Sequence, residues 1–353
     1  MDRLFHLRET LPVNIEENEK YPHVEFVLLD YNSRDGLEDW VRSTMAHHIG
    51  SGRLKYYRTY DPQTFALSHS KNMALRLGTG EIRCLLDADN YAGPGYAAWI
   101  NEVFDFYGPS AVVTTLRENA VPYGDQGGKL AFHKDAIYTV NGFDESLVGY
   151  GIEDVDLVNR MQKSGKKRIF INDDVYLKFI AHSNAHRVKN HAISRNLAEL
   201  FFQITSNMNK RNRVLYAMKD NSFLDITYEH DSSLKSLVFF SHGGWVIKNS
   251  LKGNYEREGN DIHLTYVDGT RMDYRMDATG AMRTIAANDK TLWKRIPEDE
   301  KMYIQMQLAY SECMNRAKYV ENDQKNYNSV NPDGWGRGRV FRNFDTATPI
   351  DLD

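Results

Sequence analysis

Residues 84–91 read CLLDADNY, an apolar run that ends in two carboxylates separated by a single residue. The apolar residues are typical of a buried strand, and Asp87 and Asp89 follow directly at its end. Two carboxylates so close raise each other's pKa unless a cation lies between them. Because Asp is also common in solvated turns, the pair taken alone is more simply interpreted as a turn, and a functional interpretation needs support from other parts of the chain.

Strand and helix patterns alternate around this stretch, from residue 24 to about residue 180. The predicted strands are VEFVLLD (24–30), LKYYRTY (54–60), IRCLLDAD (82–89), SAVVTTL (110–116) and GKLAFH (128–133), with helices near 35–47, over 68–77 and from about residue 94. This order predicts an α/β, Rossmann-like layer structure with a mostly parallel sheet and flanking helices. Ligands bind beyond the carboxyl ends of strands in such sheets, so Asp30 and Asp89 should face the same crevice.

After His191 the pattern changes. ISRNLAELFFQITSNMN (193–209) is interpreted as a helix, and DIHLTYVDGTRMDYR, with Asp268-Gly269 at its centre, predicts a β-hairpin. A long helix is predicted over 297–320, and the Gly/Pro-rich end should lie over the surface or be partly disordered. We therefore divide the chain into an α/β domain (1–191), a helical connector (192–233), a small antiparallel β module (234–296) and a C-terminal helix with a tail (297–353).

The totals exclude several classes of protein. The 353 residues are 41% hydrophobic and 26% charged, and the net charge of −4 does not indicate a nucleic-acid groove. The two distant cysteines favour a reducing compartment. The sequence contains no apolar run of about 18 residues, so we expect no membrane span. The first fifteen residues are too charged for a secretory signal. We expect a cytoplasmic protein, with a peripheral place at the inner face of a membrane left open.

Two further stretches carry polar residues in distinctive order. GGKLAFHKDAIYTVNGFDESLVGYGIEDVDLVNRM (127–161) places acids at the start of a predicted helix, and FIAHSNAHRVKNH (179–191) holds three histidines among basic residues. Each has a simpler structural interpretation when taken alone, since acids cap helix N-termini and a lone histidine is usually structural or solvated.

Taken together, the three stretches resemble GT-A glycosyltransferases. GG, NGF, GYGIED and the basic His run resemble the β-1,4-galactosyltransferases, which read approximately GG-x-x-A, NGF, GWGGEDDD and H-S-x-x-x-K-N. The stretch from DYNS to LLDAD is similar to the broad family-2 transferases. The resemblance covers about residues 24–190 and implies that 1–191 is a nucleotide-sugar-binding catalytic domain.

The resemblance also implies roles for individual residues. Asp89 and His182 would bind a divalent cation, Mn²⁺ in preference to Mg²⁺, with Asp87 on the ribose or on the metal's water. Asp154 would be the general base. The acceptor would be held by Tyr150, Gly151 and Glu153, and the donor by Asp30, Lys71, Asp87, Asp125 and Gly128.

Four departures from the family pattern limit how far these residue roles can be carried over to this sequence. Asp125 stands where the galactosyltransferases carry an aromatic residue, so the donor need not carry galactose. Ile152 replaces the third Gly of GWGG, and Phe179 replaces the thioether ligand of the metal. The chain also begins almost at the Asn-Arg pair that follows the family's first strand, so either Met1 is an internal start or the sheet is completed differently.

These observations predict a metal-dependent inverting transferase of polysaccharide biosynthesis, moving a hexose or N-acetylhexosamine from a UDP-sugar to a glycan or glycolipid hydroxyl. Alternatives are a retaining GT-A transferase and a degenerate glycan-binding subunit in which Trp245, Tyr255 and Tyr266 stack on sugars, although such aromatics more often fill a small core. A sugar-1-phosphate nucleotidyltransferase is disfavoured because residues 1–20 contain no Gly. A homodimer is left open.

Overall fold

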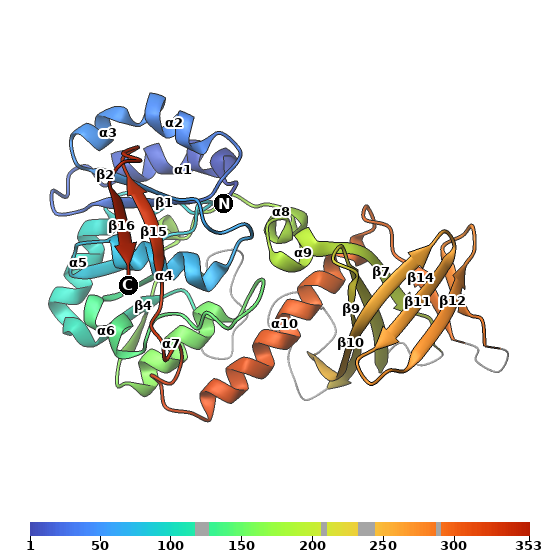
Figure 1. The fold of residues 1–353 in the computed structure, drawn as a ribbon. Helices are drawn as coiled ribbons and strands as arrows, with labels where there is room; N and C mark the ends of the chain where they lie inside the picture. The colour runs from blue at the N-terminus through green and yellow to red at the C-terminus, as the bar shows by residue number, and fades with distance from the viewer. Residues whose placement is uncertain (117–126, 206–209, 232–243, 287–290) are drawn as a thin grey trace. The chain divides into compact units, whose positions relative to one another are not determined.

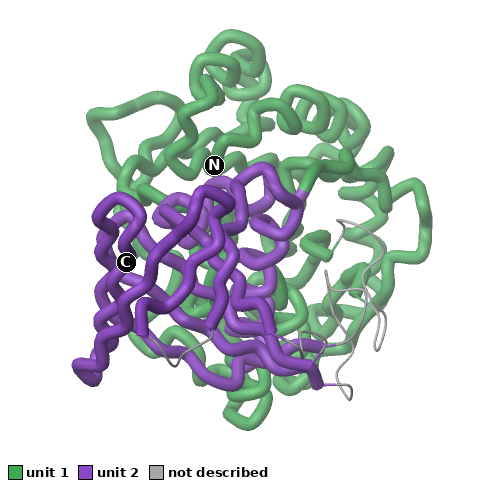
Figure 2. Tube along the Cα trace, turned by 90° about the vertical axis from the view of Figure 1, so that its right-hand side faces the viewer, with its two compact units in different colours: residues 1–183, 318–353 green, residues 184–317 purple. Residues whose placement is uncertain are grey.

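The computed structural model describes residues 1–116, 127–205, 210–231, 244–286 and 291–353 (Figure 1). It divides into two compact units, unit 1 with residues 1–183 and 318–353, and unit 2 with residues 184–317 (Figure 2). The second division falls inside the long helix α10 (Lys301–Asp323). Unit 2 is therefore inserted in the sequence between two parts of unit 1.

The first sheet of unit 1 joins the two ends of the chain. Strand β1 (Phe26–Tyr31) runs parallel to β2 (Leu54–Thr59), and β2 pairs on its other side with the antiparallel strands β15 (Gly338–Arg342) and β16 (Pro349–Leu352). The expectation of a surface or disordered tail is therefore wrong. Val340 and Leu352 are buried in the core of this sheet, so these two apolar residues of the tail supply stabilisation. The C-terminal strands widen the sheet beyond β2.

The second sheet of unit 1 carries the D-x-D stretch. Its order is β3 (Ile82–Leu85), β5 (Leu130–His133), β4 (Ala111–Thr114) and β6 (Lys167–Phe170). Strand β5 is antiparallel to both neighbours, and β4 pairs with β6 in parallel. Among the described strands each sheet of unit 1 thus has one parallel pair, and the prediction of a mostly parallel sheet is wrong. A short apolar run such as LAFH carries no signal of strand direction.

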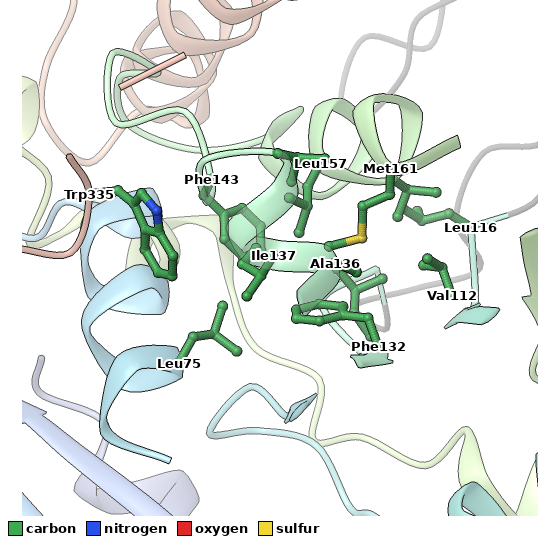
Figure 3. Close-up of a cluster of buried hydrophobic side chains, with 13 residues drawn as sticks. Leu75, Val112, Leu116, Phe132, Ala136, Ile137, Phe143, Leu157, Met161 and Trp335 are labelled. Atoms are coloured by element: carbon green, nitrogen blue, oxygen red, sulfur yellow. The ribbon is translucent and has the colours of Figure 1, made fainter. Parts of the chain in front are cut away.

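Helices accompany these sheets, and those near residues 35–47, over 68–77, from about residue 94 and after the GYGIED acids were predicted, whereas the first helix was not. The helices are α1 (Leu4–Glu17), α2 (Leu37–Thr44), α3 (Ala46–Gly50), α4 (Leu67–Leu77), α5 (Tyr96–Tyr107), α6 (Lys134–Thr139) and α7 (Glu153–Lys163). In Figure 3, Leu75 of α4, Phe132 of β5 and Met161 of α7 point toward one another in a cluster that includes Trp335. This packing fixes α7, and with it the acids of its first turn, against the second sheet.

Unit 2 contains a closed barrel in which sequence neighbours pair in antiparallel order and β14 returns to β7. Its described strands are β7 (Leu197–Gln203), β8 (Arg211–Met218), β9 (Ser222–Asp231), β10 (Gly244–Glu258), β11 (Asp261–Tyr266), β12 (Arg271–Met276), β13 (Ala281–Thr284) and β14 (Leu292–Arg295). The predicted hairpin at Asp268-Gly269 is confirmed as β11–β12, with Gly269 at φ +87°. Tyr255 and Tyr266 are buried in a core cluster, as the simpler interpretation predicted, so they do not present a sugar-stacking surface.

The predicted helix over 193–209 is wrong, and with it the helical character of the connector 192–233. Among the described residues of this range only α9 (Ala192–Asn196) is helical, and β7 follows directly, then β8 and β9. Phe201 packs in one cluster, whereas Leu200 and Phe202 pack in another that also includes Tyr303 of α10. A strand with apolar residues on both faces has no period-2 pattern, so it resembles a buried helix in the sequence.

Two shorter helices complete the described elements that matter here, the 3₁₀ turn η2 (Asp174–Tyr176) and α8 (Asn184–Val188). Over the described part of the chain, every helix is too short or too polar to span a bilayer.

Candidate active site

Asp89 and His182 come together in unit 1. Asp89 is only 8% exposed, and its Oδ2 lies 3.1 Å from Nε2 of His182. The segments carrying the two residues are joined by backbone hydrogen bonds, because Ile180 N–H donates to the Asp89 carbonyl at 2.8 Å and Tyr91 N–H to the Lys178 carbonyl at 3.1 Å. Burial disfavours the Asp89 carboxylate, but the hydrogen bond and charge of His182 outweigh it and lower its pKa.

The Gly127-Gly128 pair lies between the D-x-D and the acids of α7. A methyl group on Gly128 would lie 2.1 Å from Oδ2 of Asp87, whereas one on Gly127 would lie 4.0 Å from Oδ2 of Asp154. Only a residue without a side chain allows the backbone at position 128 to approach Asp87 so closely. Burial raises the pKa of Asp87; Lys71 opposes this shift, and Asp89 adds to it.

Glu153 and Asp154 share one buried cation, Lys71 of α4. Its Nζ lies 3.0 Å from Oε1 of Glu153 and 2.7 Å from Oδ1 of Asp154, and the side chain is 7% exposed. Burial alone would lower the pKa of Lys71, but Asp154 and Glu153 raise it well above its usual value. Lys71, expected on the donor, is thus placed against the carboxylates of the predicted base and acceptor site.

The pKa values of the two carboxyls of this pair are shifted in opposite directions. Burial raises the pKa of Asp154 to about 8; Lys71 opposes this, while the neighbouring charges of Glu153 and Asp87 support it. Burial also disfavours the Glu153 carboxylate, but the charge and hydrogen bond of Lys71 lower its pKa. Two adjacent acids with pKa values shifted in opposite directions suit one residue that moves a proton and one that stays charged.

Ile152 explains how α7 begins at these acids. It is the N-cap of α7, it is 5% exposed, and its φ of +79° lies in the left-handed region. A β-branched residue is rare there, at a cost of about 1–2 kcal/mol. The third Gly of the family pattern would adopt this conformation without strain, so Ile152 keeps the backbone turn while replacing its usual residue. Tyr150 and Gly151 precede it on the same half-buried turn, and Gly151 has φ +95°.

Asp30 occupies the end of β1 and is fully buried. Its Oδ1 accepts a hydrogen bond from Ser33 N–H at 2.8 Å, and its Oδ2 accepts one from the Tyr56 hydroxyl at 2.8 Å. Both oxygens are therefore engaged, one by β2 and one by the segment that follows β1, and a role in holding uracil or ribose remains a prediction. Asp125 lies outside the described residues.

The sequence reasoning missed two groups of residues at this site. Lys129, buried next to Gly128, donates to the Tyr91 carbonyl at 2.6 Å and to the Tyr176 carbonyl, and burial lowers its pKa to about 8. Helix α1 was not predicted, although polar residues recur at every fourth position, which is a signal that a helical-period scan would have found.

A divalent cation fits this donor set if the protein supplies only some of its ligands. Asp89 and His182 offer one carboxylate oxygen and one imidazole nitrogen, which Mn²⁺ accepts more readily than Mg²⁺ does. In the part of the chain that the structure describes, no three His, Cys, Asp or Glu side chains gather around one point. The remaining ligands would therefore come from a bound molecule and from water.

The D-x-D after a strand, the histidine on its second acid and the acid pair at a helix start are the features that the resemblance to GT-A glycosyltransferases predicted. The family comparison agrees, because residues 116–183 match the N-terminal domain of galactosyltransferase. The chain carries a glycosyltransferase domain, as the sequence resemblance predicted. No curated protein matches the chain.

Solved glycosyltransferases give looser likenesses. One is the mannosyltransferase PcManGT of Pyrobaculum calidifontis in complex with GDP-Man and Mn²⁺, at 25% identity over 49% of this chain and 52% of that chain, with a TM-score of 0.40. Another is the β-1,4-galactosyltransferase 7 of Drosophila with manganese, UDP-Gal and xylobiose, at 16% identity over 47% and 75%, with a TM-score of 0.32. A third is GalNAc-T7 with UDP, GalNAc and Mn²⁺, at 10% identity over 84% and 77%, with a TM-score of 0.40. The chain spans about half the length of the first of these.

Proposed function

We propose that the chain is a metal-dependent, inverting glycosyltransferase that moves a hexose or N-acetylhexosamine from a UDP-sugar to a hydroxyl of a glycan. One observation carries the proposal: the Glu153–Asp154 pair, held by Lys71, lies across the Gly127-Gly128 segment from the D-x-D carboxylates. A donor diphosphate at the D-x-D would thus have its anomeric carbon within the same site as a basic carboxylate.

On the donor side, Asp89 and His182 would hold Mn²⁺, with Asp87 beside them. When bound, this cation neutralises the negative charge that grows on the diphosphate as the glycosidic bond breaks. Gly128 leaves the space beside Asp87 open, since any side chain there would collide with that carboxylate. Asp87 is thereby free to meet the ribose or a water.

On the acceptor side, Asp154 accepts the proton of the acceptor hydroxyl as that oxygen attacks the anomeric carbon. The new carbon–oxygen bond forms while the bond to the diphosphate breaks, and the electron pair of that bond leaves with the nucleotide diphosphate. Lys71 holds both carboxylates in place, and the ionised Glu153 accepts hydrogen bonds from the acceptor sugar. One base on the face of the sugar opposite the leaving group is sufficient for inversion.

The test begins with hydrolysis of nucleotide sugars by the purified full chain. UDP-Gal, UDP-Glc, UDP-GalNAc, UDP-GlcNAc and a GDP-sugar are each incubated with Mn²⁺ or with EDTA. We expect one donor to be hydrolysed slowly, with the activity lost in EDTA and in Asp89→Ala and retained in Asp333→Ala, a change at an exposed aspartate. No turnover of any donor, together with no thermal shift from UDP and Mn²⁺, would refute the proposal.

The base and the stereochemistry need an acceptor. With the donor identified, Asp154→Asn should reduce transfer by about 10²–10⁴-fold while donor binding persists, because general-base catalysis contributes an effect of that size. Proton NMR of the first product should show the anomeric configuration inverted. A retained configuration would instead favour the retaining alternative and remove Asp154 from the base role.

A further inference from the structure

Helix α1 presents a row of buried polar side chains. His6, Thr10, Asn14 and, directly after the helix, Asn18 follow one another at four-residue intervals, which places them on one face, here called the α1 polar face. Their exposed fractions are 4%, 1%, 3% and 2%. Polar side chains buried so completely need hydrogen-bonding or ring partners, and the identity of those partners indicates what the face does.

Thr10 and Asn14 bind the backbone on both sides of Asp89. The Thr10 hydroxyl donates to the Ala88 carbonyl at 2.7 Å. Asn14 Nδ2 donates to the Asn90 carbonyl at 3.1 Å, and its Oδ1 accepts from Ala92 N–H at 2.7 Å. The residues immediately before and after Asp89 are thus each fixed to α1.

Asn18 extends the same pattern beyond the D-x-D. Its Nδ2 donates to the Gly93 carbonyl at 3.2 Å, and its Oδ1 accepts from Ala97 N–H at 2.8 Å in the first turn of α5. Together the three side chains bind four residues between 88 and 93 and one at the start of the next helix. This segment has left strand β3 at Leu85, so its backbone has few sheet partners.

His6 reaches the other half of the Asp89–His182 pair. Its ring centroid lies 5.2 Å from that of His182, with the two planes at 64°, an edge-on contact. The α1 polar face therefore touches the backbone that carries Asp89 and the ring that bonds Asp89. Through five hydrogen bonds this face holds the backbone from Ala88 to Gly93 and the start of α5.

We propose that the α1 polar face is the positioning element of the cation site, setting the affinity for the divalent ion by fixing Asp89 relative to His182. The inference rests on the proposed function, because it explains the affinity of the Asp89–His182 site for the divalent cation. Partners that orient metal ligands from behind change metal affinity by about 10–100-fold when they are removed. A role confined to stability would leave the affinity of the folded protein unchanged.

The test measures Mn²⁺ affinity of the full chain by electron paramagnetic resonance titration in the presence of UDP, with thermal unfolding recorded for every variant. Thr10→Val and Asn14→Ala should bind Mn²⁺ about tenfold or more weakly. Thr10→Ser, which keeps the hydroxyl, should restore the affinity. His6→Ala should weaken binding, and His6→Phe, which keeps a ring against His182, should recover most of it.

Glu9→Gln is the matched control, since Glu9 lies on the exposed side of the same helix and its variant should bind Mn²⁺ as the parent does. Should Asn14→Ala fail to fold, Thr10→Val and Thr10→Ser decide the question, because valine keeps the branched shape of threonine without the hydroxyl and serine keeps the hydroxyl. Variants that melt earlier yet bind Mn²⁺ with parental affinity would overturn the positioning role alone. A parent chain that binds no Mn²⁺ with UDP would overturn the proposed function as well.

Discussion

At the scale of single residues, the chemistry of the site depends on how its carboxylates are bonded to one histidine and one lysine. Asp89 is paired with His182, whereas Glu153 and Asp154 are both bonded to Lys71. Burial raises the pKa of Asp154 to about 8, and the charge of Lys71, which Asp154 shares with Glu153, does not offset that rise. A carboxylate made more basic in this way accepts a proton from a sugar hydroxyl more readily than an ordinary aspartate does.

This shift predicts the pH dependence of transfer. A base works only when it is ionised, so kcat/KM in the acceptor assay should rise with pH, about tenfold per unit below pH 8, and level off above it. Lys71→Met removes the cation that lowers the pKa of Asp154, so its profile should move to higher pH, whereas Lys71→Arg should resemble the parent. A profile that is flat from pH 6 to 9 would contradict the assignment of Asp154.

A second prediction concerns the closest backbone approach in the site. Gly128→Ala places a methyl group 2.1 Å from Oδ2 and 2.8 Å from Cγ of Asp87, so that carboxylate must move. We expect metal-dependent donor hydrolysis to fall by about 10–100-fold, as for other displaced partners of a metal site. Gly127→Ala is the natural comparison, because its methyl would meet Leu116 at an ordinary 3.6 Å. Equal activity of the two variants would show that Asp87 has room to adjust.

At the scale of elements, the sequence predicted best where one face of an element is polar or where turn chemistry is specific. Helix α4 begins and ends within a residue of its predicted bounds, and the Asp268-Gly269 hairpin forms as expected. Strands β3, β4 and β5 lie within their predicted ranges, but β5 runs antiparallel to both of its neighbours, because a short apolar run carries no information about direction. The same ambiguity turned β7 into a predicted helix.

The residues of the site were likewise predicted only in part. The motifs identified Asp89, His182 and the acids of α7, and the structure brings these into two groups within one unit. The partner of the acids, Lys71, was assigned to the donor because sequence spacing gives no account of which buried charges neutralise each other. The role of the α1 polar face was missed because its hydrogen bonds go to backbone atoms, and the sequence does not show which of these atoms a side chain will reach.

At the scale of the whole molecule, unit 1 depends on residues from both ends of the chain. Trp335 packs in the cluster that holds α7, and its carbonyl accepts a hydrogen bond from Arg76 at 3.0 Å. Gly336 N–H donates to Glu145 Oε1 at 2.6 Å, and Val340 is fully buried beside β2. The tail is therefore a structural part of the catalytic domain, although it lies far from the site in sequence.

Deleting residues 332–353 should consequently abolish donor hydrolysis by destabilising unit 1. Removing one buried aromatic side chain costs about 3–5 kcal/mol, and the deletion removes Trp335 together with two strands, so the loss should approach the whole stability of a domain. Limited proteolysis and thermal unfolding would measure it. Arg339→Ala, which removes only an exposed ion pair with Asp351, should change stability by less than about 0.5 kcal/mol. A truncated chain that melts like the parent would contradict this account.

The insertion of unit 2 has a consequence for synthesis on the ribosome. Residues 1–183 emerge first, but β15 and β16, which complete their sheet, emerge only after the whole of unit 2. At about 5–20 residues per second, this delay is on the order of 10–30 s, during which β2 has an unpaired edge. The barrel is continuous in sequence and can close before the enclosing domain does. A holdase that covers the open edge of β2 during this delay should therefore raise the yield of correctly folded chain.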